Sequence, residues 1–99
     1  MFMLHGRLAA KAGKREELLS ILMEGELAPS MTGCRLYLVA VDETDDEGVW
    51  VTEVWESEVA HNASLQLETV RQRIERAIPM LGMQGFKQQR LTARAGIPG

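Results

Sequence analysis

The amino-acid sequence predicts an α+β protein with the ferredoxin-like order β-α-β-β-α-β, in which two helices cover one side of a four-stranded antiparallel sheet. Three observations predict this fold. Four segments have the alternation or the residue types of strands, two have apolar residues at helical spacing, and they follow one another in that order. We expect a single domain over residues 1–99, with an ordered core over about residues 2–95 and a loose C-terminal tail of glycine and proline.

The first half of the chain supplies a strand, a helix and a second strand. Residues 2–10 alternate between two faces and predict the first strand. Residues 16–26 predict a helix, because apolar or small residues recur at the spacing of one helix face, and Pro29 and Gly33 are expected to end it. Residues 34–41 predict the second strand.

The second half begins with an acidic turn at residues 42–48. We expect a solvated hairpin loop here rather than a calcium site, because the turn lacks the ligand spacing of an EF-hand. Residues 48–56 predict the third strand. A helix is expected over residues 58–81, broken near residues 67–69, and residues 84–95 predict a weaker final strand.

Apolar side chains occur on both faces of the second and third strands. An antiparallel sheet with one solvated face normally carries polar residues on that face. Two helices can cover only one side, so the second face needs a partner. We therefore expect a homodimer in which the two open sheet faces pack against each other as a dimeric α/β barrel.

Composition and charge exclude several classes of function. The chain is 45% hydrophobic and 25% charged, and its net charge of −3 provides no basic surface for nucleic acid or for an anionic membrane. No segment approaches the roughly 20 apolar residues of a membrane span. The single cysteine, Cys34, excludes an internal disulfide, and the N-terminus lacks the pattern of a signal peptide, so a cytoplasmic location is expected. His5, His61 and one cysteine make no convincing zinc site, and no bound metal is expected.

The junction between the third strand and the next helix holds most of the chemically useful side chains. Glu53 and Trp55 share one face of the strand, because a strand alternates its side chains. Ser57 is expected to cap the helix, which places His61 and Asn62 in its opening turns. An acid, an indole and an imidazole can therefore meet here, and the sequence predicts a small pocket.

Each of these residues also has a purely structural interpretation. A tryptophan such as Trp55 is more often a core residue than a stacking platform. Glu53 can form an ion pair with a helix arginine such as Arg71 or with one across the dimer, and His61 can simply hydrogen-bond the strand end. The basic residues of the second helix are interleaved with glutamates and are interpreted as a solvated face: Arg71, Arg73 and Arg76.

Several segments are similar to those of one known family. They are Gly6-Arg-Leu-Ala-Ala-Lys-Ala-Gly13, Gly33-Cys34, Trp50-Val-Thr-Glu-Val-Trp-Glu-Ser57, Ala60-His-Asn-Ala-Ser-Leu65 and Ala77-Ile-Pro79. Over residues 2 to about 82, the chain resembles the antibiotic biosynthesis monooxygenase (ABM) family, and especially its quinol-monooxygenase-like members, within the dimeric α/β-barrel superfamily.

The resemblance implies the predicted fold, a homodimer and, as in some members, an oxygenase that uses neither metal nor flavin. Such an enzyme acts on a small aromatic or quinol-like molecule: a base deprotonates the substrate, the anion passes an electron to dioxygen, and the two radicals combine. In this chain the implied base is His61, which Glu53 would orient, because an imidazole exchanges protons near neutral pH. Trp55, Asn62 and Tyr37 would contact the substrate, and no cofactor is expected.

Other functions of the same fold were compared with this one. Haem-degrading relatives use an asparagine and a ligating histidine, but the corresponding positions here fall on Gly6 and Leu65, so haem degradation is disfavoured. A non-catalytic dimeric module that binds a small apolar molecule or a partner protein stays open as an alternative. A further alternative is an isomerase that uses the same base without oxygen.

Overall fold

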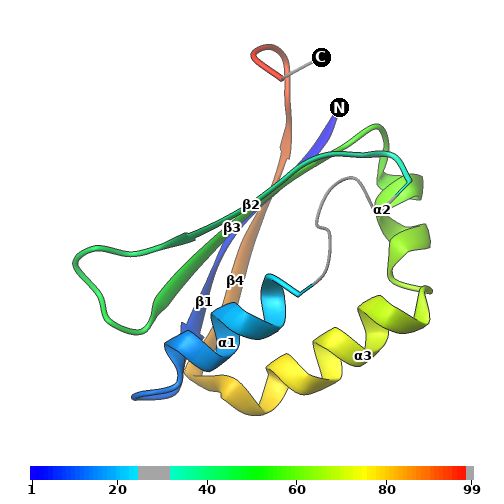
Figure 1. Cartoon of the computed structure of the whole chain (residues 1–99). Coiled ribbons are helices and arrows are strands. Elements are labelled where there is room, and N and C mark those ends of the chain that lie inside the picture. Colours follow the sequence, from blue (N-terminus) through cyan, green and yellow to red (C-terminus); the bar gives the residue numbers. More distant parts are fainter. Residues whose placement is uncertain (25–31, 98–99) are drawn as a thin grey trace.

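Strands β1 (Phe2–Ala10) and β3 (Gly48–Trp55) pair at the centre of a four-stranded antiparallel sheet in the computed structural model of the chain (Figure 1). β2 (Cys34–Val41) flanks β3 and β4 (Leu81–Thr92) flanks β1, which gives the order β2-β3-β1-β4. β1, β2 and β3 have the bounds that the alternation of side chains predicts, to within one residue. The predicted ferredoxin-like fold is therefore confirmed.

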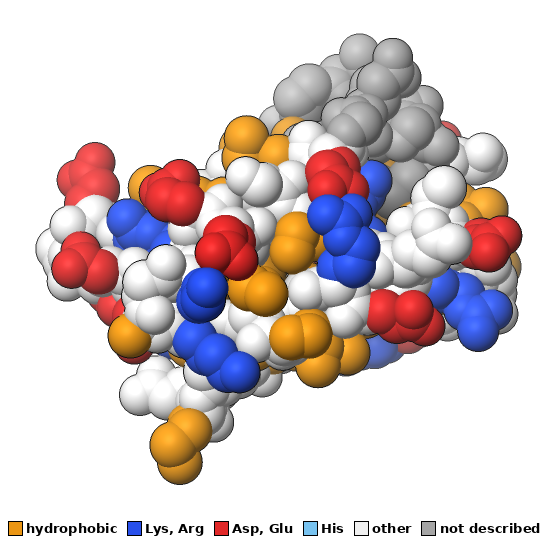
Figure 2. All heavy atoms as spheres, turned by 60° about the horizontal axis from the view of Figure 1, so that its bottom comes forward, with side chains coloured by type: hydrophobic (Ala, Val, Ile, Leu, Met, Phe, Trp, Pro, Cys, Tyr) orange, Lys and Arg blue, Asp and Glu red, His pale blue; other side chains and the backbone are white. Residues whose placement is uncertain are grey.

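Three helices lie on one side of this sheet: α1 (Arg15–Leu22), α2 (Glu58–Ser64) and α3 (Glu68–Ala77), with α3 running into a 3₁₀ turn, η2 (Ile78–Met80) (Figure 1). α1 packs against α3, and both α1 and α2 contact β3. The face of the molecule that Figure 2 shows carries acidic and basic side chains, with hydrophobic ones exposed between them. Among the residues that the structure describes, no helix is long and apolar enough to cross a membrane.

The structure describes residues 1–24 and 32–97. The predicted end of the first helix at residue 26, and Pro29, lie outside these residues. The helix predicted over residues 58–81 is two helices, because Leu67 adopts an extended backbone near the predicted break. Its last turn is the 3₁₀ turn that contains Pro79, a residue that cannot continue the α-helical hydrogen bonds.

Two local predictions concern the ends of elements. Ser57 caps α2 as predicted, since its side-chain oxygen accepts a hydrogen bond of 3.1 Å from the backbone N–H of Ala60. The final strand was predicted over residues 84–95, but it begins at Leu81 and ends at Thr92. It begins earlier because Leu81 pairs with Ala10 across a bulge in the ladder to β1.

The core lies between the sheet and the helices. Its sheet side consists of inward-facing residues of β1 and β3, and its helix side consists of one face of α1 and the end of α3. The buried members are Leu8, Ala10, Leu18, Ile21, Leu22, Val49, Val51 and Ala77. This packing fixes the register of β3, and the register decides which of its side chains point toward α2 and α3.

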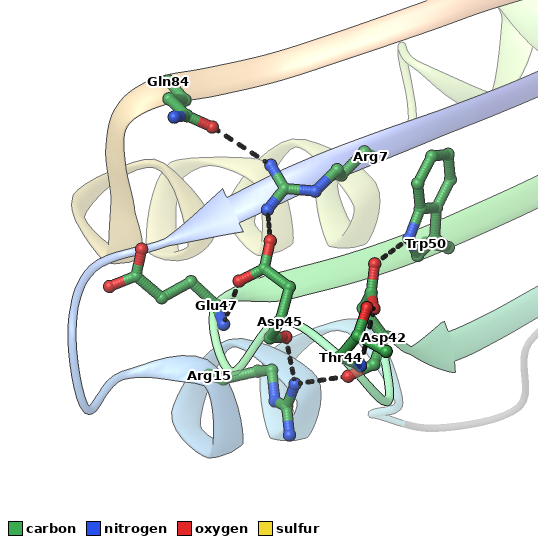
Figure 3. Close-up of polar contacts among 8 residues, drawn as sticks. All are labelled: Arg7, Arg15, Asp42, Thr44, Asp45, Glu47, Trp50 and Gln84. Atoms are coloured by element: carbon green, nitrogen blue, oxygen red, sulfur yellow. Dashed lines mark hydrogen bonds and ion pairs between the residues drawn. The ribbon is translucent and has the colours of Figure 1, made fainter.

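The acidic turn between β2 and β3 is held by specific contacts (Figure 3). Arg15 donates hydrogen bonds to the backbone oxygens of Asp42 (3.1 Å) and Asp45 (2.8 Å), and Arg7 forms an ion pair with the Asp45 carboxylate. The Asp42 carboxylate accepts hydrogen bonds from the Thr44 backbone N–H and from the Trp50 indole. These hydrogen bonds lower the pKa of Asp42 below its usual range. The hairpin loop is confirmed, although two of its acids are partners within the fold rather than fully solvated groups.

The sheet face opposite the helices carries apolar and aromatic side chains. The imidazole of His5 stacks on the Trp50 indole, with ring centroids 5.2 Å apart, and its Nδ1 lies 2.9 Å from the Thr52 hydroxyl. On the same face Leu38 is 53% exposed and Leu91 is 41% exposed. No described helix covers this face, which agrees with the apolar pattern seen in the sequence.

Candidate functional site

A cavity of about 390 Å³ lies between the sheet and the helices. β3 contributes one face of its pleat, β2 and β4 contribute flanking side chains, and α2, α3 and η2 close the other side. Its volume falls at the lower end of the range for small-molecule sites, about 300–1,000 Å³. The lining residues that carry a polar group or an indole N–H include Tyr37, Glu53, Trp55, His61, Ser64 and Arg73.

The structure brings Glu53, Trp55 and His61 together around this cavity. Glu53 and Trp55 point the same way because they are two residues apart on β3. His61 approaches from the second turn of α2, and its ring meets the Trp55 indole edge-on, with centroids 5.3 Å apart and planes at 72°. The Phe2 ring packs near the same imidazole, with ring centroids 5.6 Å apart. The convergence predicted from the sequence is thus present, while the chemical roles of the three residues stay predictions.

Glu53 has a different partner from those considered in the sequence. The Trp55 indole N–H donates a hydrogen bond of 3.1 Å to its carboxylate. Within the described residues, neither Arg71 nor the His61 ring hydrogen-bonds Glu53. The indole N–H is therefore already engaged, and Trp55 presents its ring rather than its N–H to the cavity.

Burial raises the pKa of Glu53 above its ordinary value of 4.5, while the Trp55 hydrogen bond and the nearby His61 act in the opposite direction. The carboxyl group is charged less readily in the folded protein than in the unfolded chain. Such a group binds more protons in the folded state, so the free energy of unfolding falls as the pH rises through the interval above 4.5.

The variant Glu53→Gln tests this linkage. The glutamine oxygen can still accept the hydrogen bond from Trp55, but the side chain cannot ionise. We expect the variant to gain stability relative to the wild type as the pH is raised from about 4.5 upward, measured by urea unfolding at a series of pH values. Glu43→Gln, which removes one negative charge from the exposed loop, is the matched control. A constant stability difference between Glu53→Gln and the wild type at every pH would contradict the expectation.

Tyr37 also lines the cavity, as predicted, whereas Asn62 does not. Tyr37 lies opposite Glu53 in the β2–β3 ladder. Burial, followed by the negative charge of Glu53, raises the pKa of the Tyr37 hydroxyl to about 12. The hydroxyl therefore stays protonated at neutral pH and can donate a hydrogen bond to a bound molecule. Asn62 is exposed on α2, outside the cavity lining, because the next residue of a helix points about a quarter-turn away.

Arg73 is the residue that sequence reasoning missed, since it was interpreted as part of a solvated face. Its side chain lines the cavity, donates a hydrogen bond of 2.9 Å to the Glu24 backbone oxygen, and has a buried Nε without a partner among the described residues. Arg76 does lie on the surface, where it forms a bidentate ion pair with Glu24. The available signal was spacing: Arg73 lies three residues after Val70 and four before Ala77, on the apolar stripe of the helix.

The two positions that disfavoured haem degradation can be seen in the structure. A Cβ atom added at Gly6 would lie 2.7 Å from the Lys87 backbone oxygen, so a larger side chain there requires β4 to shift. Leu65 lines the cavity with an aliphatic side chain, which cannot ligate iron. The asparagine and histidine of the haem-degrading relatives therefore have no counterparts here.

Comparisons with known proteins agree with this fold. The family model described as "Antibiotic biosynthesis monooxygenase" matches residues 1–88. A protein of Chloroflexus aurantiacus with a provisional assignment to that activity is 37% identical, with 98% of each chain covered and a TM-score of 0.81. A similarly assigned protein of Deinococcus radiodurans is 27% identical, with 99% of this chain and 97% of that chain covered and a TM-score of 0.79.

A third structure, from Caulobacter crescentus, shares the fold with a TM-score of 0.85 at 14% identity, covering 95% of this chain and 90% of that chain. No protein with a curated description matches significantly. The family match extends over most of the chain, including β1 to β3, all three helices and much of β4. The chain belongs to the antibiotic biosynthesis monooxygenase family.

Proposed function

We propose that this protein is a cofactor-independent monooxygenase that oxidises a small aromatic or quinol-like substrate with dioxygen. The convergence of Glu53, Trp55 and His61 around one cavity carries the proposal. For a phenol, the substrate and one dioxygen give a quinone and one water. The phenolate passes one electron to dioxygen, the radicals form a C–O bond, and cleavage of the O–O bond with loss of the ring proton releases water.

His61 is the proposed general base. It lines the cavity, and its ring forms no hydrogen bond with another described residue, so a substrate hydroxyl can approach it. Trp55 and Phe2 contact the ring and fix its position. Glu53 acts one step further away, because its hydrogen bond holds the indole against which the imidazole packs.

Two donors are proposed to hold the substrate anion. The Tyr37 hydroxyl stays protonated at neutral pH, and Arg73 carries a fixed positive charge with a buried, unpartnered Nε among the described residues. An unsatisfied buried donor is unfavourable, so a phenolate oxygen that accepts from it gains a charge-assisted hydrogen bond. The two groups would thus favour the ionised substrate, which is the form that reduces dioxygen.

The two tryptophans of β3 offer a matched test, because Trp55 faces the cavity and Trp50 faces the opposite side of the sheet. In Trp50→Phe, only Trp55 fluoresces, and we expect phenols and quinols to quench it in a saturable way. In Trp55→Phe, only Trp50 fluoresces, and the same compounds should leave it unchanged. Oxygen uptake by the metal-free protein is then measured over a panel of these compounds. Binding without oxygen uptake above buffer for any compound would remove the oxygenase proposal.

A non-catalytic binding module is the second candidate. The observation that favours it is Gly6, because a side chain at this position would collide with the backbone of β4, so β1 offers no polar group there. In this reading the cavity binds an apolar ring, and His61 only packs against Trp55. Saturable quenching of Trp55 would favour the module if no oxygen is consumed in air. No product should form under anaerobic conditions either.

We also propose that the protein forms a homodimer through the open sheet face. Leu38, at the centre of β2 on that face, is 53% exposed, and His5 and Trp50 lie on neighbouring strands. Burial of these side chains against a second copy would remove an apolar surface from water. A cytoplasmic location, based on the single cysteine, likewise stays a proposal.

Leu38→Glu tests the dimer. A carboxylate at the centre of an apolar interface is strongly unfavourable, so we expect the variant to elute as a monomer at micromolar concentration in size-exclusion chromatography with light scattering. Val59→Glu is the control, because Val59 is 77% exposed on α2, on the helix side. A wild-type protein that is monomeric under these conditions would overturn the proposal.

A further inference from the structure

Most polar groups that line the cavity are more buried than its outer rim, which is mainly apolar. Of the lining residues, Trp55 is 1% exposed and Ser64 is 5% exposed, and the groups able to bind a hydroxyl or an anion are half-buried beside them: Tyr37, Glu53, His61 and Arg73. Five lining residues reach the surface, and all of them except Gln88 on β4 are large and apolar. The apolar ones are Leu65 (38% exposed), Ile74 (43%), Ile78 (58%) and Phe86 (52%).

The rim lies where the helices leave the edge of the sheet uncovered. Ile74 and Ile78 belong to α3 and η2, and Phe86 belongs to the edge strand β4. α3 packs against α1, and α1 and α2 contact β3, which β1 separates from β4 in the sheet. On the face that carries α3, hydrophobic side chains are exposed between acidic and basic ones (Figure 2).

The charged residues of the lining are less exposed than this rim. In the part of the chain that the structure describes, Glu53 and Arg73 are the only charged lining residues, and both are half-buried. A substrate that was polar at both ends would leave one polar end against aliphatic carbon. An exposed apolar patch continuous with a ligand cavity is typical of a binding groove.

From this layout we infer that the substrate is amphiphilic: an aromatic ring with an oxygen substituent that enters first, and an apolar chain that lies across the rim of Leu65, Ile74, Ile78 and Phe86. The inference rests on the proposed function for the chemistry of the ring, and on the exposed rim for the chain. It makes the rim a determinant of specificity, because each methylene placed there leaves water.

A series of 3-alkylphenols, which keep the ring protons ortho and para to the hydroxyl, tests it: phenol, 3-ethylphenol, 3-butylphenol and 3-hexylphenol. Dissociation constants are measured by quenching of Trp55 in the Trp50→Phe protein. A fully buried methylene contributes about 0.8 kcal/mol, which is roughly a fourfold change in affinity. The rim is partly open, so we expect the dissociation constant to fall by about two- to fourfold for each methylene.

Ile78→Ser, made in the same background, should bind phenol as the parent does but gain less affinity per methylene. Val59→Ser is the matched control, since Val59 is exposed on α2 and lies outside the cavity lining, and it should keep the full gain. Quenching of Trp50 in Trp55→Phe measures binding of the chains to the opposite sheet face. Equal dissociation constants along the series, or an unchanged gain in Ile78→Ser, would overturn the inference.

Oxygen uptake separates this inference from the proposed function. Chain-dependent binding of alkylphenols without oxygen uptake would support the amphiphilic ligand and refute the oxygenase. Oxygen uptake with every phenol of the series, at a rate and an affinity that do not depend on chain length, would support the oxygenase and refute the amphiphilic substrate. The two proposals can therefore fail independently.

Discussion

Replacing His61 with alanine is expected to lower the rate of oxygen uptake by about 10²- to 10⁴-fold, the range typical of a lost general base. The imidazole lies on the cavity wall at the start of the helical layer, and no other described histidine lines the cavity. His61→Gln should be as slow, because an amide can hydrogen-bond the substrate hydroxyl but cannot take its proton. Oxygen uptake at saturating substrate measures this loss, and quenching of Trp55 shows whether the substrate still binds.

His5 provides the matched control for this prediction. It is the other histidine of the chain, and it stacks on the tryptophan of β3 that faces away from the cavity. His5→Ala should therefore keep the wild-type rate. Equal losses in His5→Ala and His61→Ala would indicate a general effect on the fold, and an unaltered rate in His61→Ala would remove the assignment of the base.

Much of the fold could be predicted because local signals agree with tertiary packing. The alternation of residues 2–10 and the apolar run of residues 34–41 gave strand bounds that match β1 and β2, and Ser57 caps α2 where its residue type indicated a helix start. The split between α2 and α3 was visible only as a weak break. It depends on the extended backbone of Leu67, and leucine carries no turn signal of its own.

The site could be predicted in part for the same reason. Strand alternation alone places Glu53 and Trp55 on one face, and the helix start brings His61 to them. Their hydrogen-bond partners were not predictable, because the bond between Glu53 and Trp55 depends on side-chain rotamers. Arg73 was missed because charge patterning outweighed its place on the apolar stripe, and Asn62 was included although it lies one residue beyond the cavity-facing side of α2.

Replacing Trp55 with alanine is expected to lower the free energy of unfolding by about 3–5 kcal/mol, as is usual for a buried tryptophan. Trp55 is 1% exposed and is among the largest fully buried side chains of the protein. The change also leaves the half-buried Glu53 carboxylate without its donor, which adds the penalty of an unsatisfied polar group. Single domains have about 5–15 kcal/mol of stability, so the variant should be close to unfolding and is best compared by urea titration.

Two further variants separate the packing of Trp55 from its hydrogen bond. Trp50→Ala removes the half-buried tryptophan of the opposite face and should be destabilised less than Trp55→Ala. Trp55→Phe keeps most of the ring but loses the indole N–H, and combining it with Glu53→Leu, which removes the acceptor, completes a double-mutant cycle. A non-zero coupling energy would show that the carboxylate stabilises the indole position against which His61 packs. Zero coupling would mean that burial alone holds Trp55, and Glu53 would then have no positioning role in the proposed chemistry.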